Sequence, residues 1–270
     1  MRLKHILIFC MVPMLLGSCG EYAQLQKSGD IGEKYSYAKK CYNEKKYSRA
    51  ATLLEEVVPV YSNSSEGAPS LFLLADSYYN MNREADASLT FQQFYKTYPK
   101  NAQAEEALYK AGEGLYKVSP DPRLDQTATY DAIKELNSYL ENYPTGKYAK
   151  EVTNMLYEMQ DKLAYKEYLA AKLYYNLGPY MGNNYRSCVV TAKQAIEDYP
   201  YSKYKDDLVF IMLKAKYQEA LYSRQDKMQE RYRDVVDQYY TYINGFPKGK
   251  YVKEAQKLYD DTKKRIVKVD

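Results

Sequence analysis

Few side chains of this sequence could carry out nucleophilic or acid–base chemistry. The single histidine is His5, and it lies in a segment that we expect to be removed during export. Without an imidazole, the remaining chain can form neither a Ser-His-Asp nor a Cys-His site, nor a metal site that needs histidine. Neighbouring carboxylates could act as acid–base pairs at Glu55-Glu56, Glu105-Glu106, Asp206-Asp207 and Asp260-Asp261. Each pair lies in a charged stretch typical of a solvated helix face, so we expect no enzyme, no cofactor and no metal site.

Cys19 is the cysteine whose context indicates covalent chemistry. A basic start, MRLKH, precedes an apolar run over residues 6–16 that is too short to span a bilayer. The run ends in LGSC, which resembles the lipobox of bacterial lipoproteins, where the cysteine is acylated and becomes the mature N-terminus. The alternative is an ordinary signal peptide with an incidental cysteine. We predict a lipoprotein signal peptide at 1–18, a lipid on Cys19, an acylated linker at 19–31, and a lipid-anchored location on the outer membrane that faces the periplasm.

The net charge and the two remaining cysteines further limit the class of protein. Loss of Arg2 and Lys4 with the signal leaves 37 of the 39 basic residues, against 35 acidic ones. This balance gives no indication of a nucleic-acid partner. Cys41 and Cys188 remain, and an oxidising compartment would permit a disulfide between them.

One phrase recurs along the chain as YPTGKYAKE from Tyr143, YPYSKYKDD from Tyr199 and FPKGKYVKE from Phe246. Proline disfavours the α conformation in the residue before it and lacks a backbone N–H, so the phrase ends one helix. The small residue that follows caps or turns into the next helix. Weaker versions begin at Tyr61 and Tyr98. The phrase therefore predicts a joint between two helices.

The segments before these joints share a pattern of apolar and small residues. Five residues before the proline position stand Val57, Phe94, Tyr139, Ala195 and Tyr242; eight before stand Leu54, Phe91, Leu136, Ala192 and Tyr239; twelve before stand Ala50, Ala87, Ala132, Cys188 and Val235. Offsets of three, four and seven place these residues on one helical stripe. Cys188 takes a small packing position and Cys41 a packing position in a first helix, so we expect two buried thiols rather than a disulfide.

This pattern is typical of the tetratricopeptide repeat, although the joints are spaced more widely than in a standard repeat. We predict an all-α, tetratricopeptide-like α-solenoid of about five helix pairs, with repeats 1–3 at 32–144 and repeats 4–5 plus a capping helix at 145–270. Residues 118–128 read as a loop within the third repeat. Residues 147–177 contain neither glycine nor proline, which indicates either one very long helix or two helices with a tight joint.

In that region the sequence resembles the BamD family, the lipoprotein subunits of the outer-membrane β-barrel assembly machinery. The resemblance rests on DKLAYKEYLAAKLYYNLGPY, VVTAKQAIEDYP and PDPRLDQTATYDAIKELNSYLENYPTGKYA. It implies a scaffold whose C-terminal repeats hold the POTRA region of the barrel protein BamA, beside other subunits, and whose N-terminal repeats receive unfolded outer-membrane proteins. The position of a family arginine that faces BamA corresponds here to Thr191, so Arg186, Thr191 and Lys193 are the interface candidates. A second hypothesis is another periplasmic repeat lipoprotein that organises peptidoglycan or envelope factors; the long segment at 147–177 favours the first.

The chain has 34 tyrosines and no tryptophan, and some of these rings lie off the packing stripe. On the free face of the first helices, which lines the concave groove of tetratricopeptide arrays, we place Tyr35, Lys39, Tyr42, Asn43, Phe72, Asp76, Tyr79, Asn80, Tyr109, Glu113 and Tyr116. A ring with a polar tip suits an extended peptide, because it buries area while its hydroxyl pairs with backbone groups. The alternative is that these residues form only half-buried repeat surface.

Overall fold

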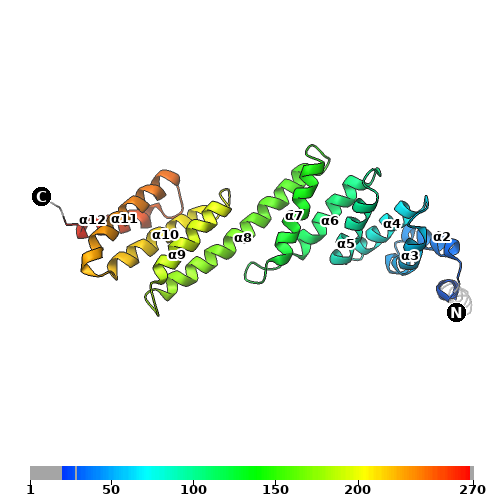
Figure 1. Cartoon of the computed structure of the whole chain (residues 1–270), viewed down its shortest axis with the longest axis horizontal. Helices are drawn as coiled ribbons and strands as arrows, with labels where there is room; N and C mark the ends of the chain where they lie inside the picture. Colours follow the sequence, from blue (N-terminus) through cyan, green and yellow to red (C-terminus); the bar gives the residue numbers. More distant parts are fainter. Residues whose placement is uncertain (1–19, 28, 268–270) are drawn as a thin grey trace, which may run out of the picture. The chain divides into compact units, whose positions relative to one another are not determined.

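The computed structural model describes residues 20–27 and 29–267, so Cys19 lies outside the described part of the chain. Within the described residues, all regular secondary structure is helical (Figure 1), which confirms the predicted fold class. The helices are α2 (Ile31–Asn43), α3 (Tyr47–Tyr61), α4 (Gly67–Asn80), α5 (Glu84–Thr97), α6 (Ala104–Val118), α7 (Thr127–Asn142), α8 (Ala149–Leu177), α9 (Asn184–Asp198), α10 (Lys205–Leu221), α11 (Gln225–Gly245) and α12 (Val252–Arg265). The long segment is thus a single helix, α8, and the expected loop separates α6 from α7.

The helices form two compact units. Unit 1 comprises Met1–Ser119 and Ala128–Val152, and unit 2 comprises Pro120–Thr127 and Thr153–Asp270. Unit 1 contains the pairs α2–α3, α4–α5 and α6–α7, while unit 2 contains most of α8 with α9, then α10–α11 and the terminal helix α12. The division falls inside α8, a few residues after the predicted start of repeats 4–5.

The predicted packing stripe forms the core of both units. All fifteen residues at the three stripe positions are buried, and thirteen of them have no exposed surface. Cys41 and Cys188 are buried free thiols, as predicted. Burial raises the pKa of the Cys41 thiol, and it raises the pKa of Cys188 to about 12. Because the thiolate is the reactive form, neither sulfur is available as a nucleophile at neutral pH.

The recurring phrase forms a hydrogen-bonded joint in unit 1. The Tyr139 hydroxyl donates to Oε1 of Glu105 over 2.7 Å and accepts the backbone N–H of Tyr148 over 3.0 Å. The backbone N–H of Lys147 donates to the same carboxylate oxygen over 2.6 Å. The backbone N–H groups in the turn before α8 have no acceptor within the helix, and these bonds supply one.

Unit 2 contains the same joint before α12. The Tyr242 hydroxyl donates to Oδ1 of Asp206 over 2.8 Å and accepts the backbone N–H of Tyr251 over 3.0 Å. The backbone N–H of Lys250 donates to Oδ2 of Asp206 over 2.8 Å. In both units, therefore, a carboxylate in the first turn of one repeat holds the phrase that opens the next.

Residues 20–27, which we expected to be a linker, form a helix that packs on repeat 1. The Tyr22 ring stacks on the Tyr37 ring, with centroids 6.4 Å apart, and Leu25 packs against the hydrophobic core of unit 1. The Arg49 guanidinium lies over the Tyr22 ring at 5.1 Å. Among the described residues, no helix combines the length and the apolar character that a membrane span requires.

Candidate functional site

The first helices of the three repeats in unit 1 carry the candidate peptide-binding residues at equivalent places. Residues 35, 72 and 109 are 37 positions apart, and the same spacing relates 39, 76 and 113 and also 42, 79 and 116. They lie on α2, α4 and α6 in turn. We call this set, with Asn43 and Asn80, the first-helix face.

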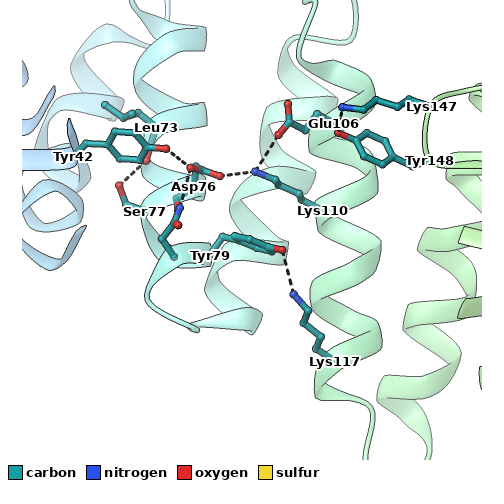
Figure 2. Close-up of polar contacts among 11 residues, drawn as sticks. Tyr42, Leu73, Asp76, Ser77, Tyr79, Glu106, Lys110, Lys117, Lys147 and Tyr148 are labelled. Atoms are coloured by element: carbon teal, nitrogen blue, oxygen red, sulfur yellow. Dashed lines mark hydrogen bonds and ion pairs between the residues drawn. The ribbon is translucent and has the colours of Figure 1, made fainter. Parts of the chain in front are cut away.

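Asp76 is the centre of a polar network that joins the three helices of this face (Figure 2). This residue is buried, with 7% of its surface exposed. The Tyr42 hydroxyl of α2 donates to Oδ2 of Asp76, and Lys110 of α6 pairs with Oδ1 over 2.5 Å. Lys110 also pairs with Glu106 over 3.0 Å. A buried carboxylate is tolerated here because donors from both neighbouring helices reach it.

Burial and neighbouring charges shift the pKa values of Tyr42 and Lys110 in this network. Burial and the hydrogen bond to Asp76 raise the pKa of Tyr42 above its ordinary value, so its hydroxyl remains a donor. Burial alone would lower the pKa of Lys110, but its contacts with Asp76 and Glu106 outweigh burial and raise it. Lys110 therefore keeps its charge at neutral pH, and its ammonium group lies between the carboxyl groups of Asp76 and Glu106.

A second cluster of the face surrounds Tyr79. The Nζ of Lys117 lies 4.5 Å from the centre of this ring and 3.3 Å from its hydroxyl oxygen, and Lys110 lies 4.9 Å from the ring centre. Lys117 also pairs with Glu113 over 3.1 Å. The other carboxylate oxygen of Glu113, Oε2, is buried and receives no hydrogen bond from the described residues. The cluster thus combines a half-buried ring, two cations and an acceptor that lacks a donor.

Several candidates differ from the expectation that their side chains lie outside the packing stripe. Tyr35 and Tyr109 are buried, with 5% and 7% of their surface exposed, because the rings of Tyr61 and Tyr148 pack against them. Phe72 is half-buried and contacts core rings of α5. These corrections leave the rings of positions 42, 79 and 116 as the half-buried aromatic surface of the face.

The polar candidates also have local partners. The amide of Asn80 donates to both the backbone and the carboxylate of Asp76, so it is not free for a client backbone as expected. Lys39 is exposed, with its Nζ 4.2 Å above the Tyr35 ring. Asn43 is exposed and remains available.

The three candidates for the BamA interface lie on α9 in unit 2. Arg186 and Lys193 are exposed and seven residues apart, which places them on one face of the helix, while Thr191 is half-buried. Lys193 pairs loosely with Glu197 over 3.7 Å. Sequence reasoning missed Val190, which lies between the two cations on the same face and is 60% exposed.

Every carboxylate of the acidic pairs considered for catalysis has a structural partner. Glu55 accepts the Tyr78 hydroxyl over 2.6 Å, and Glu56 pairs with Lys34 over 2.6 Å. The remaining pairs bind the joints and helix ends: Glu105 binds Tyr139, Glu106 binds Lys110, Asp206 binds Tyr242, Asp207 binds Lys250, Asp260 binds Gln256, and Asp261 binds Arg265. The described residues contain no cluster of His, Cys, Asp and Glu that could hold a metal ion.

Lys110 is a second functional candidate that sequence reasoning missed. It lies one residue after Tyr109, off the predicted face, but its long side chain reaches Asp76 on the neighbouring helix. A lysine three residues before Glu113 was the available signal. The signal is weak, because lysine is common on exposed helix surfaces.

Residues 28–181, more than half of the chain, match the model of a family described as outer membrane lipoprotein. The chain belongs to this family. Its placement at the outer membrane, as a lipoprotein, therefore agrees with the signal and lipobox read from the sequence.

The relatives point to one process. A protein of Neisseria gonorrhoeae named outer membrane protein assembly factor BamD is 24% identical over 247 residues, which cover 84% of this chain and 87% of the relative. The protein of the same name from Neisseria meningitidis serogroup B is 23% identical over 272 residues, covering 93% and 95%. A protein of Aquifex aeolicus is 31% identical over 175 residues, so the match covers 62% of this chain and little more than half, 56%, of that relative.

Proposed function

We propose that this protein is an assembly factor for outer-membrane β-barrel proteins, a lipid-anchored periplasmic scaffold without enzymatic activity. The observation that carries the proposal is the family membership, together with relatives that bear the name BamD across nearly their whole length. The structural roles of the acidic pairs and the buried thiols support a binding protein over a hydrolase. Repeat arrays present extended surfaces that suit this task.

The first-helix face is the proposed binding site for unfolded outer-membrane proteins. An extended client strand would lay apolar side chains on the rings of Tyr42, Tyr79 and Tyr116, and its backbone would hydrogen-bond the exposed amide of Asn43. Because an unfolded client loses conformational entropy on binding, we expect a micromolar Kd, about −8 kcal/mol.

A peptide titration tests this site. The probe is a labelled peptide with the sequence of a C-terminal barrel strand that ends in an aromatic residue, added to the chain from residue 20. Tyr79→Ala with Tyr116→Ala should weaken binding at least tenfold, about 1.4 kcal/mol, because these rings supply contact area. Tyr201→Ala with Tyr222→Ala is the matched control, since both rings are exposed and lie in unit 2. Equal affinity of both double variants, with intact circular dichroism, would rule out this face.

The exposed face of α9 is the proposed contact for the POTRA region of a BamA-like barrel protein, with other subunits of the complex bound elsewhere. Arg186 and Lys193 would pair with carboxylates of the partner on either side of Val190. Co-purification from membranes tests the contact: Arg186→Glu with Lys193→Glu should lose the BamA-like protein, whereas Lys248→Glu with Lys253→Glu should retain it. Loss in neither variant would place the interface on another surface. Recovery of only peptidoglycan-associated proteins would contradict the assembly function itself.

A further inference from the structure

The helix at residues 20–27 runs antiparallel to α2 and returns the start of the described chain to one corner of repeat 1. The backbone oxygen of Gln26 lies 3.5 Å from Nζ of Lys34, at the beginning of α2. At its other end, the Glu21 carboxylate lies 4.0 Å from Nζ of Lys40, at the end of α2. The residues that follow Cys19 are therefore docked at the turn between α2 and α3.

That turn is strongly basic. Residues 39–49 contain five basic side chains and a single carboxylate, Glu44. We call the five the basic corner: Lys39, Lys40, Lys45, Lys46 and Arg49. The four lysines are exposed. The corner lies directly against the helix at 20–27, because Lys40 approaches Glu21 and Arg49 covers Tyr22. Glu44, paired with Lys46 over 2.6 Å, and Glu21 offset only part of this charge.

The position of Cys19 in the sequence limits how far this corner can lie from a membrane anchor. Three peptide units separate Cys19 from Tyr22, so their Cα atoms are at most about 11 Å apart. Acyl chains on Cys19 would enter the hydrocarbon, whose headgroup layer is about 6 Å thick on each side. The guanidinium of Arg49, 5.1 Å from the Tyr22 ring, would then lie within reach of the phosphate groups, where electrostatic screening over a Debye length of about 8 Å is incomplete.

We propose that the basic corner binds an anionic phospholipid surface beside the acylated Cys19, and that the helix at 20–27 fixes unit 1 in this orientation. The proposal rests on the acylation of Cys19, and the basic corner shares only Lys39 with the proposed client site. A lipid anchor combined with a basic patch is a recognised two-part mode of membrane attachment. A lipid surface fits this corner better than a protein partner, because the chain itself delivers the corner to the bilayer.

Vesicle flotation of the unacylated chain from residue 20 tests the charge component. We expect binding to vesicles of phosphatidylcholine with phosphatidylglycerol that falls with rising salt, and little binding to pure phosphatidylcholine. Lys40→Glu with Lys45→Glu and Lys46→Glu should weaken binding at least tenfold. Lys248→Glu with Lys253→Glu and Lys264→Glu, three exposed lysines of unit 2, change net charge equally and should not. Equal loss in both variants, or no binding of the unaltered chain, would overturn the proposal.

The absence of tryptophan allows a direct test of the orientation. Ser48→Trp places a single fluorophore on the exposed surface of the corner, and Tyr130→Trp places one on the exposed surface of α7, in the third repeat of the same unit. In the acylated protein on vesicles with a headgroup nitroxide lipid, we expect quenching of the first to be several-fold stronger. Tyr22→Ala with Leu25→Ala should undock the helix and reduce that difference while the lipid keeps the protein bound. Equal quenching at both sites, or a difference that survives undocking, would reject the orienting role of the helix.

Discussion

The ring of Tyr148 stacks on the ring of Tyr109, with centroids 4.0 Å and planes 8° apart. The equivalent pair in unit 2, Tyr251 on Phe210, has the same geometry at 4.3 Å and 6°. In each pair the first ring belongs to the repeated phrase, and the second lies four residues after the carboxylate that binds the phrase. Each joint is therefore fixed by one carboxylate and one aromatic ring on the same helical face.

Gly249→Ala should destabilise unit 2 by about 1–3 kcal/mol, because a side chain at this position overpacks the joint. A Cβ atom there would lie 2.6 Å from the Tyr242 hydroxyl and 2.8 Å from Cβ of Phe246. Gly245→Ala is the control, since a Cβ at that position meets nothing within 4 Å. Urea unfolding monitored by circular dichroism measures both.

Tyr242→Phe removes the hydroxyl that the new methyl group would strike. The double variant Gly249→Ala with Tyr242→Phe should therefore lose less free energy of unfolding than the sum of the two single changes. Strict additivity would show that the hydroxyl does not determine the need for glycine at this joint.

In the joint between α9 and α10, a serine supplies the hydroxyl that a tyrosine supplies in the other two joints. Ala195 stands where Tyr139 and Tyr242 stand in the other joints, and Ser202 stands in place of glycine. The Ser202 hydroxyl donates to Asp161 over 2.8 Å and accepts the backbone N–H of Tyr204 over 3.2 Å. The hydroxyl thus comes from tyrosine where the later position is glycine, and from serine where the earlier position is alanine. Both arrangements make equivalent hydrogen bonds.

We expect Ala195→Tyr alone to cost about 1–3 kcal/mol, because the ring and its hydroxyl would compete with the buried Ser202 for one space. Ala195→Tyr combined with Ser202→Gly should recover part of that loss by recreating the arrangement of the other joints. Thermal melts of the three variants provide the comparison. If the double variant were less stable than Ala195→Tyr, the two arrangements of the joint would not be equivalent.

The regular spacing of apolar residues was sufficient to predict the helix pairs and the core stripe, because burial requires the same face in every repeat. The role of Ser202 in replacing a tyrosine hydroxyl was not predictable, since a serine shortly after proline is also an ordinary helix cap. Burial of Tyr109 depends on stacking with Tyr148, which lies far away in the sequence. The helix at 20–27 is too short for its periodicity to indicate it, and its stability comes from docking.

Alkaline pH should destabilise both units as tyrosines of the unfolded chain ionise. Burial, with hydrogen bonds to carboxylates, raises the pKa of Tyr35 in unit 1 and of Tyr217 in unit 2 from 10.0 to about 12. Between these values the unfolded state releases protons that the folded state retains, so the stabilisation is complete below pH 10 and is lost as the pH rises toward 12.

Melting temperatures from pH 8 to 11.5, with tyrosinate absorbance, measure this effect. Tyr217→Phe should flatten the pH dependence in unit 2, whereas Tyr201→Phe, at an exposed ring, should leave it unchanged. Full tyrosinate absorbance near pH 10 in a protein that remains folded would contradict the assignment.

The pair of Asp76 and Lys110 should show strong energetic coupling in a double-mutant cycle. Asp76→Asn removes the charge that faces Lys110, and we expect a loss of about 1.5–3 kcal/mol, as for a hydrogen bond to a charged group. Lys110→Met leaves the carboxylate with its donors Tyr42 and Asn80. Because each single change leaves a poorly solvated charge, the double variant should be less destabilised than the sum, with a coupling of at least about 1 kcal/mol.

The exposed pair of Lys193 and Glu197 is the matched control, since its side chains are 67% and 56% exposed and 3.7 Å apart. Its cycle should give only about 0.3–0.5 kcal/mol, because water screens the two charges and both chains lose rotamer freedom. Similar coupling energies for the two pairs would mean that Asp76 is solvated through the first-helix face. That result would also remove the reason to treat Asp76 as the centre of a preorganised binding surface, because its partners would then be free to rearrange around a client.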